Sequence, residues 1–490
     1  MSRQRVLVLS ASVGSGHKTA ARALEAAFQE HADVEVLNQD VLELTNETYT
    51  RLSADAYLML AKRAPWLLGW VYDVNDAPFT NEQPLRKMWD MLNTQPVVRF
   101  VKDYRPHISV CTHFTPAGII AQLMATDQLD TSLSVVTTDY DFQGMWLSPT
   151  FNRYFVARNE SKARLIDLGV AAERITLSGI PVDPRFGEPV DRPAVLDRYE
   201  LRSDLPVILV SAGAVGGGPA RDIVAQIMKM RHEVQCIVVC GSNQRMLHEV
   251  EALTAPRASH FRVLGFSSDM LNLVRVATLF VGKPGGLTAS ECMAAGTPMV
   301  IVTPIPGQEE RNADYLLEEG AAVRSNDIET VDYKIDRLLD EPERLERLRA
   351  NARRLGRPDA AQVIAATALA DRQEPVQINW RAQLEALRPD PAPAAPRLLW
   401  EPVTAVRLYD DERGVYLGAV TSDQFRKLRR ILADFDAQAG TATLDTRHVE
   451  RLRELGADRE VCEGLAERIA RYGPLRVRHS KVRQEQPSQA

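Results

Sequence analysis

The chain has 490 residues, more than one ordinary hydrophobic core holds, so two or three domains are expected. Its net charge of −6 argues against a general nucleic-acid surface, and five cysteines without a disulfide-like framework suit a reducing cytoplasm. No apolar stretch reaches the ~18 residues that a membrane span needs, and the apolar run at residues 6–9 is too short for a signal peptide.

The first predicted strand, residues 5–10, runs into a glycine loop. Gly14 and Gly16 lead to His17, and residues 18–28 carry a helical apolar stripe. A second strand is predicted at residues 34–37. A lone histidine at a helix start more often bonds locally, but a G-x-G-H turn directly after a strand favours a functional role for His17.

Residues 45–100 are dense in apolar and aromatic side chains, including Trp66 and Trp70. Packing helices are one interpretation. The other is an amphipathic patch that dips into a bilayer, with four basic residues near anionic head groups. Those residues are Lys62, Arg63, Arg86 and Lys87.

Two more predicted strands of the first half end in polar side chains. Residues 106–113 end in His113 and residues 132–139 end in Asp139. Because ligands of open α/β sheets bind beyond the carboxyl ends of the strands, His17, His113 and Asp139 are expected at one edge. A turn cap is the alternative role for Asp139.

The second half repeats this plan after a connection at residues 179–184. A strand at residues 207–213 runs into a loop with Gly213, Gly216, Gly217 and Gly218. Further strands are predicted at residues 236–241, where Cys236 and Cys240 are expected in the core, and at residues 262–266. A glycine loop after the first strand of each half predicts two stacked Rossmann-like domains.

Residues 278–303 read as strand, loop, helix and strand. The loop residues Lys283, Gly285 and Gly286 precede a helix that ends at Gly296. Backbone N–H groups at a helix start attract anions, and a diphosphate is a suitable ligand for such a site. Thr288 and Glu291 lie on one face of that helix, where a carboxylate could accept bonds from two vicinal hydroxyls.

Residues 283–291 read KPGGLTASE and residues 304–312 read PIPGQEERN. Together these motifs resemble glycosyltransferase family 28, in particular the diacylglycerol glycosyltransferases of plants and bacteria. The lipid II N-acetylglucosaminyltransferase is a more distant relative. The resemblance covers residues 5–370 and implies a GT-B fold of the α/β class, with two Rossmann-like domains facing a cleft.

The same resemblance implies roles for the site residues. Glu291 would hold the ribose and the glycine loop the diphosphate, while Gln308 and Glu309 would face the sugar. The backbone of Gly265 and Phe266 would pair with the base, although a plain turn is nearly as good an interpretation. The implied acceptor-side residues are Gly14, Gly16, His113, Gln143 and Trp146.

The implied chemistry is inverting transfer of a hexose from a UDP-sugar to a lipid, with His17 and Asp139 as base or base relay. The diphosphate would be stabilised by loop N–H groups and Lys283. The expected chemistry uses no metal or other cofactor, and the UDP-sugar is the donor substrate. Gln143 stands where related enzymes commonly have a histidine, and glutamine cannot act as a base.

Two alternatives stay open. One is a UDP-sugar epimerase or hydrolase of the same fold, and the other is a catalytically silent nucleotide-sugar sensor, which the departure at Gln143 keeps open. The expected partners are a UDP-sugar, a lipid acceptor and an anionic membrane surface, with no nucleic acid. The protein is expected in the cytoplasm, peripheral on the inner face of the membrane. The sequence indicates neither the sugar nor the oligomeric state.

The domain organisation follows from these assignments and from composition. Residues 357–372 are expected to form a helix that returns to the first domain, and residues 475–490 are basic, then polar, and expected to be disordered. Residues 399–474 read as an accessory α+β module with strands at 405–409 and 415–419 and helices at 422–438 and 447–472. The predicted domains are residues 1–178 for the acceptor, 179–374 for the nucleotide sugar, a proline-rich linker at 375–398, the module at 399–474 and the tail.

Overall fold

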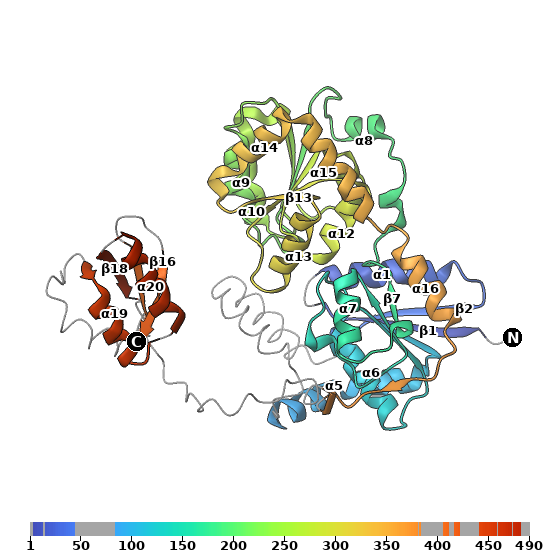
Figure 1. The fold of residues 1–490 in the computed structure, drawn as a ribbon. Helices are drawn as coiled ribbons and strands as arrows, with labels where there is room; N and C mark the ends of the chain where they lie inside the picture. The colour runs from blue at the N-terminus through green and yellow to red at the C-terminus, as the bar shows by residue number, and fades with distance from the viewer. Residues whose placement is uncertain are drawn as a thin grey trace, which may run out of the picture. The chain divides into compact units, whose positions relative to one another are not determined.

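A computed structural model gives the fold (Figure 1). The chain divides into two compact units, residues 1–388 and residues 389–490, which are described separately. The structure describes residues 3–12, 15–44, 84–380, 382–383, 405–410, 416–421, 441–457, 459–472 and 474–481.

The first lobe of the larger unit is a six-stranded parallel sheet in the order β2-β1-β3-β4-β6-β7. Its strands are β1 (Gln4–Ser10), β2 (Val34–Asp40), β3 (Ile108–Cys111), β4 (Ser132–Val136), β6 (Arg153–Val156) and β7 (Ile175–Leu177). Its helices are α1 (Ser15–Gln29), α2 (Val41–Leu44), α5 (Pro84–Tyr104), α6 (Phe114–Ala125) and α7 (Asn159–Asp167). The central strands are buried along most of their length, as parallel strands covered on both faces are.

The second lobe is also a six-stranded parallel sheet, in the order β10-β9-β8-β11-β12-β13. Its strands are β8 (Val207–Ser211), β9 (Gln235–Val239), β10 (Phe261–Leu264), β11 (Leu279–Gly282), β12 (Met299–Val302) and β13 (Ala322–Ser325). Its helices are α8 (Arg192–Arg198), α9 (Ala220–Ile227), α10 (Gln244–Thr254), α11 (Met270–Val276), α12 (Gly286–Ala295), α13 (Gln308–Glu318), α14 (Val331–Asp340) and α15 (Pro342–Leu355). Two Rossmann-like sheets were the prediction, and the structure shows them. Cys236 and Cys240 are buried, as expected of core residues.

The chain returns to the first lobe through α16 (Ala360–Ala370), as the sequence predicts. This helix lies beside α1 (Figure 1). Ala361, Ile364 and Ala365 share a buried cluster with Val6 and Val8 of β1. Four of the five buried residues of α16 are alanines, whose small side chains allow close packing.

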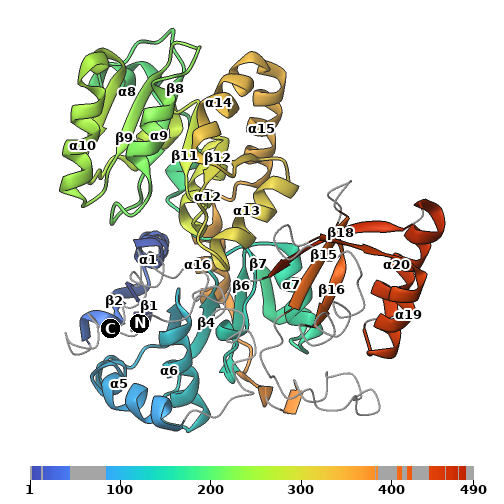
Figure 2. The same cartoon turned by 90° about the vertical axis from the view of Figure 1, so that its left-hand side faces the viewer.

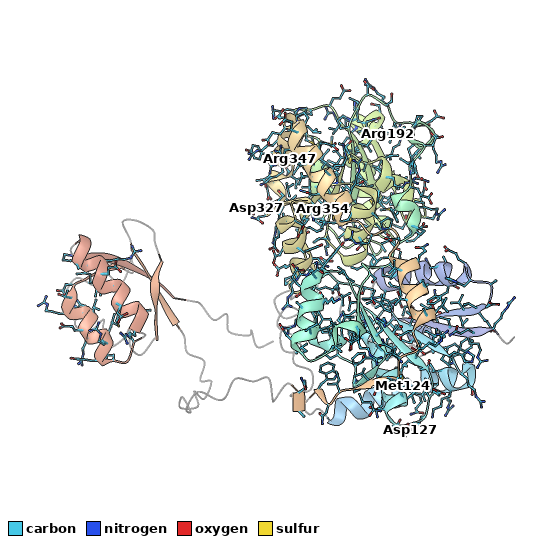
Figure 3. The ribbon with its side chains drawn as sticks, turned by 45° about the vertical axis from the view of Figure 1, so that its right-hand side comes forward. Met124, Asp127, Arg192, Asp327, Arg347 and Arg354 are labelled. Carbon is cyan, nitrogen blue, oxygen red and sulfur yellow. The ribbon has the colours of Figure 1, made fainter. Side chains whose placement is uncertain are left out.

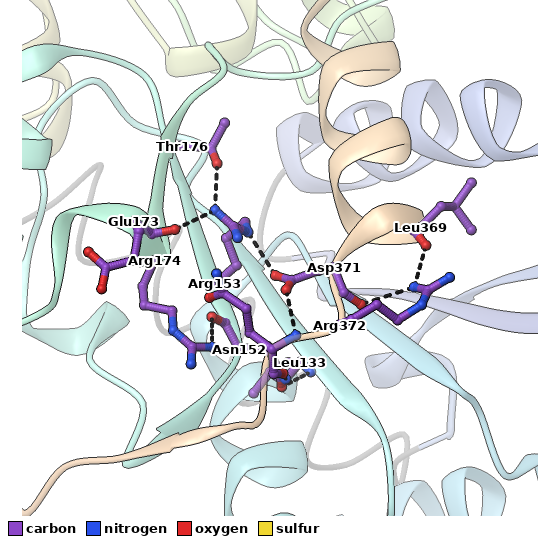
Figure 4. Close-up of polar contacts among 10 residues, drawn as sticks. Leu133, Asn152, Arg153, Glu173, Arg174, Thr176, Leu369, Asp371 and Arg372 are labelled. Carbon is purple, nitrogen blue, oxygen red and sulfur yellow. Dashed lines mark hydrogen bonds and ion pairs between the residues drawn. The ribbon is translucent and has the colours of Figure 1, made fainter.

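The segment after α16 is held by the first lobe, which corrects the prediction that the linker begins at residue 375. Asp371 pairs with Arg153 at 2.8 Å, and both side chains are largely buried (Figure 4). Strand β14 (Val376–Gln377) pairs antiparallel with β5 (Thr150–Phe151). Trp380 is 1% exposed, and its Nε1 donates to the carbonyl oxygen of Ser148 at 2.8 Å. A buried tryptophan with a satisfied N–H anchors the segment, which composition alone did not reveal.

The smaller unit contains an antiparallel sheet in the order β16-β15-β18-β17, with α19 and α20 on one face (Figure 2). Its described elements are β15 (Ala405–Asp410), β16 (Tyr416–Thr421), β17 (Thr441–Leu444), α19 (Thr446–Glu454), α20 (Arg459–Tyr472) and β18 (Leu475–Lys481). The predicted strands at 405–409 and 415–419 are confirmed as β15 and β16, the second with slightly shifted bounds.

Two predictions for this unit are wrong. The single helix predicted at residues 447–472 is two helices, because Gly456 has a φ of 75° and ends the first of them. Residues 475–481 form strand β18 between β15 and β17 instead of a disordered tail. Alternating basic and apolar residues there pair as a strand. The helix predicted at residues 422–438 lies outside the described residues.

The aromatic segment at residues 45–83, with Trp66 and Trp70, also lies outside the described residues. Phe100, in the C-terminal part of α5, is partly buried and packs against the core of the first lobe. No helix in the described part of the chain is long and apolar enough to cross a membrane.

Candidate active site

A cleft of about 1050 Å³ is lined by residues of both lobes. Its walls come from the loops at the carboxyl ends of β1, β3, β4, β8, β11 and β12, and α1 faces α12 (Figure 2). Strand order reverses between β1 and β3 in one sheet and between β8 and β11 in the other. Such switch points are where open α/β sheets bind ligands.

His17 lies in the first turn of α1 and lines the cleft. Its Nδ1 lies 2.9 Å from the carbonyl oxygen of Thr112 and 2.9 Å from the hydroxyl oxygen of Thr138. A carbonyl oxygen only accepts, so Nδ1 carries the hydrogen and Nε2 of the neutral ring holds the lone pair. Burial lowers the pKa of His17, although the Thr112 carbonyl and the charge of Asp40 oppose that effect. The ring is therefore neutral near pH 7 and can accept a proton at Nε2.

His113 is buried beside His17, with ring centroids 4.6 Å apart in an edge-to-face arrangement. It caps α6 by accepting the N–H of Thr115 at Nδ1, at 3.1 Å. Burial, together with the neighbouring His17, holds the pKa of His113 well below its usual value. With Nδ1 accepting, the hydrogen of the neutral ring is on Nε2. The two cleft histidines thus have opposite tautomers, one able to accept and one able to donate.

Asp139 follows β4 and is 5% exposed. Burial raises the pKa of its carboxyl to about 6, although hydrogen bonds from Gln308 and Asn312 lower it. The Gln308 amide donates to Asp139 Oδ1, across the two lobes. Asn312 also accepts the N–H of Tyr140 at 3.0 Å and donates to the Pro284 carbonyl. The acceptor-side carboxylate and the donor-side loops are therefore joined in one network.

The lobes approach each other closely at Gly286. A Cβ there would lie 2.0 Å from the carbonyl oxygen of Thr138, so only glycine fits. One turn further along α12, Ser290 bonds the Tyr140 hydroxyl at 3.0 Å. Asp141 pairs with Arg311 of the second lobe at 2.7 Å and with Arg158 of the first at 2.9 Å. Gly286, predicted as a diphosphate ligand, thus also sets the spacing of the lobes.

Glu291 and Thr288 face the cleft from one side of α12, as their spacing predicts. Burial and the negative charge of Asp183 raise the pKa of Glu291 to about 7. A partly buried carboxylate beside another acid is costly to ionise. Hydroxyl donors would offset that cost, and the position of Glu291 suits vicinal hydroxyls of a ligand.

Lys283, Gly285 and Glu309 surround the N-terminus of α12. Burial raises the pKa of Glu309, although the charge of Lys283 and the N–H of Ile305 oppose the shift. Glu309 Oε2 accepts that N–H at 2.7 Å, which holds the second loop. A lysine charge beside a helix start that has no side-chain cap favours an anion at this point.

The second glycine loop reaches the cleft only in part, which corrects its predicted role. Gly213 lines the cleft, with a φ of 79°. Gly216 N–H donates to the Gly213 carbonyl, and Gly218 N–H donates to the Ala212 carbonyl. These two amides close the loop on itself and cannot also bind a phosphate. Gly217 is exposed on the loop and does not line the cleft.

Phe266 lines the cleft and is 70% exposed, whereas Gly265 lies behind it near the Gly241 carbonyl. An exposed aromatic ring in a cleft offers a face on which a planar base could stack. Of the two residues of the predicted base-binding turn, Phe266 therefore lines the cleft and Gly265 does not.

The predicted acceptor-side residues come together, apart from Gly14, which lies outside the described residues. Gly16, His113, Gln143 and Trp146 line one wall of the cleft. Gln143 is 4% exposed and precedes the short helix η1 (Gly144–Trp146). Its burial there is compatible with a hydrogen-bonding role, which is the one role left to an amide.

Three contributors were missed by sequence reasoning. Thr138 places its hydroxyl on His17, Asn312 bridges the lobes, and Asp183 perturbs Glu291. Asp183 sits in the stretch interpreted as a connection. The available sequence signal was the glycine and two prolines of residues 179–184, which favour an ordered turn, and Gly179 has a φ of 85° in the structure.

Two cleft-forming Rossmann-like lobes of this kind define the GT-B fold. Among solved structures, MurG of Acinetobacter baumannii aligns with a TM-score of 0.51 at 18% identity, over 75% of this chain and 100% of that one. A putative UDP-N-acetylglucosamine 2-epimerase of Listeria monocytogenes aligns with a TM-score of 0.52 at 14% identity, over 75% of this chain and 96% of that one. At such identities the likeness shows the fold alone.

Family models match both lobes: monogalactosyldiacylglycerol synthase over residues 17–182 and glycosyl transferases group 1 over residues 221–355. A processive diacylglycerol beta-glucosyltransferase of Bacillus mycoides is 29% identical over 377 residues, covering 75% of this chain and 94% of its own length. Another, of Bacillus cereus, is 28% identical over 375 residues with the same coverage. Across both lobes the chain is similar to the diacylglycerol glycosyltransferases, and it is a glycosyltransferase.

Proposed function

We propose that this protein transfers a hexose from a UDP-sugar to the hydroxyl of a lipid, with diacylglycerol as the acceptor. The observation that carries the proposal is the pairing of two sites across one cleft. A base-competent His17 stands on one wall, and an anion site with the Glu291 carboxylate stands on the other. The relatives named above are diacylglycerol glucosyltransferases, which supports the same substrates.

In the proposed reaction, Nε2 of His17 accepts the proton of the acceptor hydroxyl as the oxygen attacks the anomeric carbon. The C–O bond to the diphosphate breaks on the opposite face, which inverts the configuration. Proton removal by a positioned base contributes about 10²–10⁴-fold to such a step. Asp139, linked to Gln308, orients the acceptor side against the donor loop.

The departing diphosphate gains one negative charge that needs stabilisation. Lys283 and the N–H groups that open α12 lie where that charge would develop. We propose that these groups serve in place of a metal ion and that the reaction uses no other cofactor. Phe266 would hold the base, and Glu291 the ribose.

The proposal is tested by incubating the full chain separately with UDP-glucose, UDP-galactose and UDP-N-acetylglucosamine, in vesicles that contain diacylglycerol. Mass spectrometry of the extracted lipids should show a diacylglycerol heavier by one hexose. Repeated addition would appear as a ladder of such masses. Release of free hexose without a new lipid would instead indicate a hydrolase, and a changed UDP-sugar without a new lipid would indicate an epimerase.

We also propose that the protein works in the cytoplasm, peripherally on an anionic membrane, through residues 50–100. The support is the sequence: Trp66 and Trp70 lie among apolar residues, with Lys62 and Arg63 close by. Replacing both tryptophans with serine should reduce vesicle flotation more than added salt does, because salt screens only the charges. Unchanged flotation of a folded double variant would place the contact elsewhere.

A further inference from the structure

A second cavity, of about 280 Å³, opens in the second lobe away from the cleft. Four arginine side chains line it, together with residues at the ends of α11 and α12. The arginines are Arg192, Arg275, Arg349 and Arg353. No residue of this cavity lines the cleft.

The cavity lies at the opposite edge of the sheet from the cleft. Thr278 and Thr297, which line it, precede strands β11 and β12. Lys283 and Gly285 follow β11 and line the cleft. Figure 3 shows Arg192 at the part of the second lobe that is remote from Met124 and Asp127 of the first. Anything bound here is therefore separate from the nucleotide site.

Few carboxylates neutralise the four guanidinium groups: Glu346 lies beside two of them, and Asp183 interacts electrostatically with Arg275. Arg349 lies 3.0 Å and Arg353 3.7 Å from the single carboxylate of Glu346. Arg192 donates to the Val276 carbonyl and Arg275 to the Glu188 carbonyl. Neutral carbonyl oxygens accept hydrogen bonds from the guanidinium N–H groups but do not neutralise their positive charge.

Two further observations indicate that this positive charge is only partly compensated. Burial, and then the charge of Arg349, lowers the pKa of Arg192. The Nε of Arg275 is buried without a hydrogen-bond partner. Like charges held together out of water destabilise a fold unless an anion joins them.

We propose that this cavity, the four-arginine pocket, is a binding site for a compact phosphate-bearing anion. Arginine forks match the geometry of phosphate oxygens and bind them bidentately. A volume of about 280 Å³ falls below the usual ~300–1,000 Å³ of small-molecule pockets. The pocket thus suits one or two phosphate groups and not a whole nucleotide. The anion could come free from solution or as the head group of a phospholipid.

A purely structural role is the competing explanation. Arg192 and Arg275 hold carbonyl groups near the ends of helices, which favours positive charge. Arg349 and Arg353 make no such bond to the ends of α11 or α12 among the hydrogen bonds of the described residues, and both come from α15. Substitution of these two residues therefore tests anion binding without removing the bonds that cap the helices.

The test uses inorganic pyrophosphate titrated calorimetrically into the full chain, with excess UDP filling the cleft. The site variant is Arg349→Gln/Arg353→Gln. The matched control is Arg347→Gln/Arg354→Gln, which removes the same charge from the same helix but outside the pocket. We expect the parent and the control to bind pyrophosphate, and the site variant to bind at least about tenfold more weakly. UDP affinity should be the same in all three, which also reports folding.

Absence of pyrophosphate binding in the parent, or an equal loss in both variants, would overturn the proposal. If the site variant fails to bind UDP, Arg349→Lys/Arg353→Lys replaces it, because it keeps the charge and removes only the forks. Flotation with phosphatidylcholine vesicles, with and without phosphatidylglycerol, then separates the sources. Flotation that needs Arg349 and Arg353 indicates a head group, and flotation that does not need them indicates a free anion.

Discussion

The Nδ1 atom of His17 lies 2.9 Å from the carbonyl oxygen of Thr112, and this contact determines which ring nitrogen is a base. Thr112 follows β3 and His17 opens α1, so two neighbouring strands of one sheet set the tautomer. The lone pair is on Nε2. A ring held this way needs no acid partner to be oriented for proton removal.

Replacing His17 with alanine should lower turnover at least about 100-fold, the low end of general-base effects, and leave UDP binding nearly unchanged. The groups proposed to bind the nucleotide lie on the other wall of the cleft. Steady-state rates and calorimetry with UDP measure the two quantities. His248→Ala, on an exposed helix of the second lobe, is the control. Near-parental turnover in the His17 variant would return this histidine to a structural role.

Uridine affinity should rise with pH through about 7, because the pKa of Glu291 is raised to about 7. Below that pH the carboxyl is protonated in the free protein; above it the carboxylate accepts ribose hydroxyls more strongly. Uridine is the probe because it has no phosphate to titrate. Glu291→Gln should remove the pH dependence and weaken binding at high pH by about 1 kcal/mol. The same slope in both proteins would contradict the assignment.

Gly286→Ala should destabilise the chain by about 1–3 kcal/mol or force the lobes apart and lower turnover, because the new Cβ meets the Thr138 carbonyl. Gly118→Ala is the matched control: it lies in α6 with open space around it and should stabilise by about 0.5–1 kcal/mol. Thermal unfolding and rates report both. A Gly286 variant as stable and active as the control would show that the lobes do not approach this closely.

Trp380→Ala should cost about 3–5 kcal/mol of unfolding free energy, as for other buried aromatic residues. Tyr333→Ala, at a side chain that is 60% exposed, should change it by less than about 0.5 kcal/mol. Denaturant unfolding of the full chain compares the two. Equal, small effects would mean that the segment after α16 does not dock on the first lobe.

The sequence predicted the sheet elements and the cleft walls well, because a glycine loop directly after an apolar strand is typical of the βα turns of Rossmann-like domains. His17, His113 and Asp139 were placed together because parallel strands end at one edge. Thr138 and Asn312 act through contacts between distant segments, and no local pattern encodes those. The closing bonds of the Gly216 and Gly218 amides depend on how the loop folds back on Ala212 and Gly213.

The errors at the end of the chain have a similar cause. Composition assigned residues 375–380 to a linker. Trp380 instead bonds to Ser148 of the first lobe, which lies more than 200 positions earlier in the chain. Basic residues in β18 suggested a disordered tail, yet the strand gains order by pairing on both sides. Long-range pairing of this kind leaves little trace in local sequence.

The central claim is direct displacement at the anomeric carbon by a lipid hydroxyl. The most direct test is proton NMR of the glycolipid made from an α-linked UDP-hexose and diacylglycerol, read at the anomeric coupling. We predict a β-linked product from the parent and a rate at least about 100-fold lower from His17→Ala. An α-linked product, or free hexose without glycolipid, would contradict the account.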